Sequence, residues 1–142
     1  DIELPVMLAM WLSLSVSEIR GITKSKSIRD GQLYIIETVV DIKGKPVRKA
    51  GAKEEERPRA FNIPKYIAEL INNVDGDIIE TRSAHAINQR FQRVLRQNGL
   101  HTMRFHDLRH PYVKQKTKKL AITFGPGTER FSQPPFLFLG AV

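Results

Sequence analysis

The segment that most constrains the fold is residues 2–20, which predict a helix with apolar side chains on most of its faces. A helix that is apolar all round has to be covered on every side by other elements. The apolar run within it, Leu4 to Leu12, is too short for a bilayer span, which takes about 20 residues. No basic segment precedes the run, so a secretory signal peptide is not expected. The segment therefore predicts a buried helix of a globular domain, with apolar positions at Leu4, Met7, Leu8, Trp11, Leu12 and Val16.

The next part of the chain favours strands. Residues 32–42 are rich in Tyr, Ile, Thr and Val, which are enriched in strands. Residues 44–46 read Gly-Lys-Pro, a turn signal that sends the chain back on itself. Residues 58–63 predict a further short strand, and a basic loop is expected over residues 48–57. The simplest assembly of these segments is a small antiparallel sheet.

Three helices are predicted after the strands. The first covers residues 64–73 and opens on a proline, which the first helical position tolerates. The second covers residues 83–98, with Ser83 as its cap and Gly99 at its end. The third starts near residue 107 and runs to about residue 119. The predicted fold class is therefore α+β and mainly helical, with helices packed around a small antiparallel sheet.

Length and composition indicate one domain and exclude several chemistries. A chain of 142 residues suggests one domain, which we place at residues 1–118. Residues 119–142 differ in composition, being rich in Gly, Pro and Phe, and no regular element is expected there. Cysteine is absent, which excludes disulfides, thiolate-bound zinc and a thiol nucleophile.

The charge points to a polyanionic partner. The formal charge is +8, and two clusters carry much of it, at residues 43–59 and 104–119. Such clusters favour phosphate contact and hence double-stranded DNA, although a solvated charged surface is the alternative. A membrane is not expected as the partner. The candidate DNA contacts are Lys43, Lys45, Arg48, Lys49, Arg57, Arg59, Arg93, Arg96 and Arg104.

Four motifs occur in an order that resembles the catalytic domain of the tyrosine recombinases, the family of phage integrases. Residues 105–110 read FHDLRH, similar to the family's His-x-x-Arg box. Residues 14–19, LSVSEI, resemble its first box, and residues 53–64 resemble the hairpin that carries its lysine. The helix predicted over residues 83–98, just before the His box, also matches the family's order of elements. The resemblance covers residues 2–118.

This resemblance implies site-specific DNA recombination or integration by phosphoryl transfer, without metal or other cofactor. In the family a tyrosine attacks the scissile phosphate, and two arginines and a histidine hold its oxygens. Arg109 corresponds to the second arginine, His106 to the histidine and Lys53 to the general acid, while Glu18 corresponds to a supporting acid. A bidentate guanidinium suits two phosphate oxygens, and a lysine can donate a proton. The family works as a homotetramer on DNA, whereas we expect this chain alone to be a monomer, in the cytoplasm of a bacterial cell near its nucleoid.

The chain departs from the family at two catalytic positions. Ser15 stands where the first box carries arginine, and residues 119–142 contain neither Tyr nor His. The tyrosines present, Tyr34, Tyr66 and Tyr112, do not fall where the family places its nucleophile. We therefore expect a cleavage-defective chain, with a non-catalytic DNA-binding module as the alternative description.

A remote alternative is a zinc hydrolase that uses His106 and His110, two histidines at i and i+4. Pro111 disfavours the helix interior that such a site needs. Arg104 and Arg109 would also repel the cation. No metal site is therefore predicted.

Overall fold

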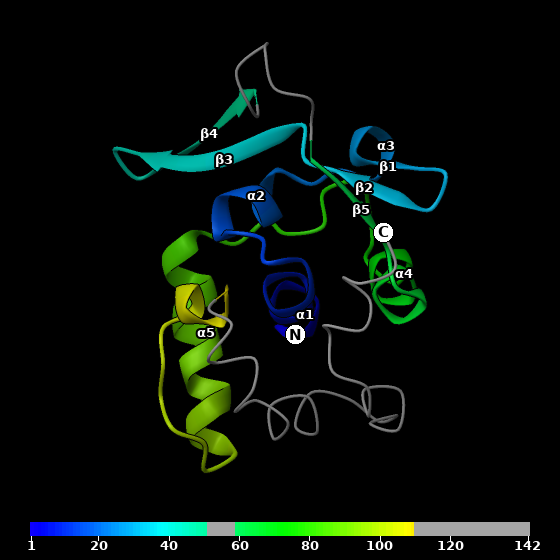
Figure 1. Cartoon of the computed structure of the whole chain (residues 1–142). Helices are drawn as coiled ribbons and strands as arrows, with labels where there is room; N and C mark the ends of the chain where they lie inside the picture. Colours follow the sequence, from blue (N-terminus) through cyan, green and yellow to red (C-terminus); the bar gives the residue numbers. More distant parts are fainter. Residues whose placement is uncertain (51–58, 110–142) are drawn as a thin grey trace.

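The computed structural model describes residues 1–50 and 59–109 of the chain (Figure 1). Helix α1 (Glu3–Leu12) occupies the middle of the molecule, and its residues from Leu4 to Met10 are all buried. The prediction of a buried helix is therefore confirmed. The prediction of one continuous helix over residues 2–20 is wrong, because Ser13 takes a left-handed conformation with φ of 56° and ends α1. A second helix, α2 (Val16–Gly21), then begins after Ser15, and a single turn, α3 (Lys24–Ser27), follows.

The strands form two small antiparallel sheets where the sequence predicts one. The first sheet has the order β1-β2-β5, with β1 (Ile28–Arg29), β2 (Gln32–Tyr34) and β5 (Ala60–Asn62). The second is a two-stranded ribbon of β3 (Glu37–Ile42) and β4 (Lys45–Ala50). In Figure 1 both sheets lie toward one end of the molecule, above α1, rather than at its centre.

Two of the predicted strand boundaries are wrong. The run over residues 32–42 is divided between β2 and β3, which belong to different sheets. No Gly or Pro marks the division, so residue preferences alone give no sign of it. The predicted basic loop starts too early, since residues 48–50 belong to β4; residues 51–58 lie outside the described part of the chain.

Tight turns join the paired strands. Lys43 and Gly44 both have positive φ, at 50° and 75°, and connect β3 to β4. This two-residue connection confirms the predicted reversal, because positive φ at both central residues matches the twist of a hairpin. Asp30 and Gly31 make the same kind of turn between β1 and β2, with φ of 50° and 73°. Asp-Gly is a hairpin signal, so β1 could have been predicted.

The remaining helices cover α1 from two sides (Figure 1). Helix α4 (Lys65–Asn72) follows Pro64, which is its cap rather than its first residue. Helix α5 (Ala84–Gln97) begins as predicted, with the Ser83 hydroxyl accepting a hydrogen bond from the Ala86 N–H at 3.1 Å. The α4 and α5 side chains that enter the common core are Ile67, Ile71, Ile87, Phe91 and Leu95.

The last described element is a 3₁₀-helix, η1 (Phe105–Arg109), where the sequence predicts a longer α-helix beginning near residue 107. Residues 110–119 of that prediction lie outside the described residues. The described chain is thus a mixed α/β structure with small antiparallel sheets. Among its helices, none combines the length and apolar character needed to cross a bilayer.

Candidate nucleic-acid interface

The corner between α1 and α2 contains the first of the motifs. Ser15 caps α2: its hydroxyl accepts a hydrogen bond from the Glu18 N–H at 3.3 Å. The Glu18 carboxylate accepts one in return from the Ser15 N–H at 2.7 Å. This capping box satisfies two N–H groups that a helix start leaves without partners. Ser15 therefore has a structural task at the position where the resemblance expects arginine.

The His box lies in η1, and its 3₁₀ geometry decides which side chains share a face. Side chains three residues apart eclipse one another in such a helix. Phe105 and Leu108 make up the buried face, with exposed fractions of 2% and 0%. His106 and Arg109, also three apart, share the neighbouring face, where His106 is exposed and Arg109 half-buried. The His-x-x-Arg spacing thus puts an imidazole and a guanidinium on the same side of η1.

Arg109 joins the His box to the first motif. Its Nε donates a hydrogen bond to the Ser13 carbonyl at 2.8 Å, across 96 positions of sequence. Ser13 is two residues from Ser15, so this contact brings η1 against the corner where α2 begins. The rest of the guanidinium keeps N–H groups that could reach a phosphate.

Three contacts that the sequence analysis missed hold η1 in place. The Asn88 side-chain oxygen, from α5, accepts a hydrogen bond from the Phe105 N–H at 3.0 Å. Phe91 and Phe105 stack edge to face, with ring centroids 5.5 Å apart. Asp107 accepts from the Arg104 N–H at 3.0 Å and from its guanidinium, and that side-chain bond holds the pKa of Asp107 below its usual range. Arg104, predicted as a DNA contact, is thus paired with Asp107 within the protein.

Glu18 connects the same corner to the second half of the lysine motif. Its carboxylate forms an ion pair with Arg59, the residue just before β5. The Arg59 guanidinium also lies over the Phe61 ring, 5.6 Å from its centroid. An arginine so held is pre-oriented, and with 52% of its side chain exposed it can still face a ligand.

The structure therefore gathers four predicted site residues around the start of α2, namely Ser15, Glu18, Arg59 and Arg109. His106 lies on the same face of η1 as Arg109. Lys53, Arg57, His110 and Tyr112 lie outside the described residues, so their predicted roles stay predictions. Within residues 1–50 and 59–109, no group of three or more His, Asp or Glu side chains could hold a metal ion.

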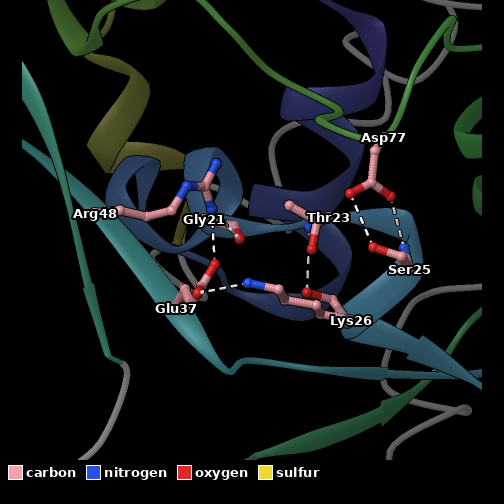
Figure 2. A network of polar contacts seen from close by, with 8 residues as sticks. Gly21, Thr23, Ser25, Lys26, Glu37, Arg48 and Asp77 are labelled. Atoms are coloured by element: carbon pink, nitrogen blue, oxygen red, sulfur yellow. Dashed lines mark hydrogen bonds and ion pairs between the residues drawn. The ribbon is translucent and has the colours of Figure 1, made fainter.

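The basic residues of the β3–β4 ribbon divide into two kinds. Arg48 points inward: it donates to the Glu37 carboxylate at 3.0 Å and to the Gly21 carbonyl at 3.1 Å (Figure 2). Lys26 approaches Glu37 as well, and its hydrogen bond is the largest of the causes that lower the pKa of Glu37. Arg48, predicted as a DNA contact, thus fastens the ribbon to α2. Lys43, Lys45 and Lys49 are exposed.

Helix α5 presents two further predicted contacts. Arg93 and Arg96 are exposed, on the side of the helix opposite its buried residues. Helix α5 contains no Asp or Glu, so no carboxylate of its own neutralises them. An acid-free helix face of this kind suits phosphate contact.

Comparison with known proteins adds no assignment: no protein-family model matches the chain, and neither a curated protein nor a solved structure matches it significantly.

Proposed function

We propose that this chain is a DNA-binding domain of the tyrosine-recombinase type, which holds duplex DNA through phosphate contacts and does not cleave it unaided. The observation that carries the proposal is the convergence at the start of α2. The first box, the second half of the lysine motif and the His box are far apart in sequence. They meet through Glu18–Arg59 and Arg109–Ser13.

Chance similarity of short motifs would not require this convergence. A phosphate site built from arginines needs them held near one another, because a guanidinium contributes most when its N–H groups are already oriented. Arg59 is oriented by Glu18 and Phe61, and Arg109 by the Ser13 carbonyl. Both retain exposed surface, so the corner can offer cationic donors to an anionic backbone.

The first test is duplex binding measured by fluorescence anisotropy as a function of salt. Affinity should fall steeply between about 50 and 200 mM salt, by about 10³ if six phosphates are contacted. The variant Arg109→Ala should lower the log–log salt slope by about one, as expected for one lost phosphate contact. Arg29→Ala, which removes an exposed arginine from β1, is the matched control and should leave the slope unchanged.

A purely structural role for Arg109 would lower thermal stability and leave the salt slope unaltered. Absence of binding at 50 mM salt, or binding that salt does not weaken, would contradict the proposal itself.

A further inference from the structure

The β3–β4 ribbon has two chemically different faces. Side chains alternate along a strand, and residues directly opposite each other in an antiparallel pair share a face. The register therefore sorts the ribbon into an inner and an outer set. The inner face carries Glu37, Val39, Asp41, Pro46, Arg48 and Ala50, and the outer face carries Thr38, Val40, Ile42, Lys45, Val47 and Lys49.

Side chains of the inner face bind the ribbon to α2. Asp41 accepts two hydrogen bonds from the Arg20 guanidinium, at 3.0 and 2.9 Å, and the Arg20 side chain is only 4% exposed. Glu37 is bound by Arg48 and Lys26 at the other end of β3. Both acidic residues of the ribbon are thus paired inward. The ribbon's orientation is fixed at two points, and its outer face is turned away from α2.

The outer face contains no acidic residue; Ile42 and the two lysines are exposed on it, whereas Thr38, Val40 and Val47 are half-buried. The Lys45 and Lys49 side chains make no hydrogen bond or ion pair with another described residue. Ile42 is 43% exposed, one of two large apolar side chains exposed to this degree in the described chain. Ile42 lies opposite Lys45, and the next pair on this face, Val40 and Val47, lies between the two lysines; these three side chains form an apolar row. This is a cationic face with an apolar middle.

We propose that this outer face enters the major groove of duplex DNA, an inference that rests on the proposed function. A two-stranded ribbon, with strands about 4.8 Å apart, fits the major groove of about 12 Å but not the minor groove of about 6 Å. Lys45 and Lys49 meet the phosphates that line the groove. The apolar row meets base edges, where thymine methyl groups offer apolar contact.

The test compares two double variants that remove the same charge. Lys45→Ala/Lys49→Ala should weaken duplex binding about tenfold or more and lower the salt slope by about two. Arg29→Ala/Lys65→Ala removes two exposed cations from β1 and α4 and should change both quantities much less. Circular dichroism should show both variants folded, since the Lys45 and Lys49 side chains make no hydrogen bond or ion pair with the described residues and alanine leaves their backbone pairing in place.

The groove that the chain enters is tested with the whole chain and two duplexes, one with its major groove filled and one with its minor groove filled. Glucosylated hydroxymethylcytosine fills the major groove and should weaken wild-type binding, while netropsin, which fills the minor groove, should not. The glucosylation effect should shrink in Lys45→Ala/Lys49→Ala.

The outcomes separate the two proposals. A wild-type chain that binds no DNA overturns both. A wild-type chain that binds DNA, with equal losses in the two double variants or with sensitivity to netropsin alone, overturns only the groove assignment. If the lysine variant changes self-association and not DNA affinity, the face joins copies of the chain, and the assignment is likewise overturned.

Discussion

At Gly21 the absence of a side chain is what lets α2 approach β3. A Cβ placed there would lie 1.9 Å from the Glu37 carbonyl oxygen, which is backbone and cannot move aside alone. Gly21→Ala should therefore push α2 and β3 apart and lower the free energy of unfolding by about 1–3 kcal/mol, the usual cost of overpacking. Urea denaturation monitored by circular dichroism measures the change.

Gly44→Asn is the matched control for that substitution. Gly44 has φ of 75°, a region that Asn tolerates better than most residues, and no atom lies within 4 Å of a Cβ built there. Its effect should be smaller than that of Gly21→Ala. Equal stability of Gly21→Ala and the wild type would show that the α2–β3 contact is not close in solution.

The β3–β4 ribbon is an element held more by charge than by apolar packing. Val39 is its one buried residue, whereas Asp41 and Arg48 both make hydrogen bonds to α2. The hydrogen bond from Arg20 lowers the pKa of Asp41, and that from Lys26, with help from Arg48, lowers the pKa of Glu37. Ionised carboxylates are therefore part of what holds the ribbon to α2.

The lowered pKa values predict that the folded chain loses stability as the pH falls. A carboxyl whose pKa is lower in the folded chain stabilises the fold above its unfolded value, near 3.8 for Asp and 4.5 for Glu. That stability is lost as pH falls through the still lower folded value. The drop in Tm between pH 6 and pH 3 should thus be smaller in Asp41→Asn/Glu37→Gln than in the wild type.

Asp75→Asn is the control for the acid experiment, because Asp75 is exposed and has no hydrogen bond or ion pair within the described residues. Its Tm drop should match the wild type. An unchanged drop in the double variant would mean that these two carboxylates do not link stability to pH.

Elements with their own start and stop signals could be predicted from the sequence, and those shaped by tertiary contacts could not. Helix α5 has its Ser83 cap and regular apolar spacing, and both are local. The break at Ser13 has no local signal, because Leu14 is fully buried and continues the apolar pattern from α1 toward α2. The division of residues 32–42 depends on the pairing of β2 with β5, in which Gln32 lies opposite Asn62, 30 residues further along the chain.

The candidate site shows the same limit. The His box and first box could be found by their residue types, since these carry the chemistry. Asn88, which holds the Phe105 N–H, gave no such sign: a lone Asn in a helix carries no pattern, and its role depends on the distant chain that returns to it. Likewise, the sequence could not separate Arg48 from Lys49, which the ribbon's pleat sends to opposite faces.

For the molecule as a whole, the last prediction is that the 142-residue chain binds DNA without becoming covalently attached to it. Both tyrosines in the described residues are engaged elsewhere: the Tyr34 hydroxyl donates to Gln32 at 2.8 Å, and the Tyr66 hydroxyl bonds to Glu3. Tyr66 lies on α4, across α1 from η1 (Figure 1). A phosphotyrosyl bond needs a tyrosine hydroxyl beside the phosphate, and both tyrosine hydroxyls within residues 1–50 and 59–109 are bonded to other side chains.

The variant Ser15→Arg tests the missing first-box arginine separately from the missing tyrosine nucleophile. It would supply a charged donor, and one such donor is typically worth about 10²–10³ in rate, but it adds no nucleophile. It also removes the Ser15 cap of α2, at a cost of about 1 kcal/mol. A nicked duplex analysed on a denaturing gel should therefore show no covalent band for the wild type or for Ser15→Arg. A band mapped to Tyr34, Tyr66 or Tyr112 would contradict this, and it would identify the attacking residue that the alignment of motifs had missed.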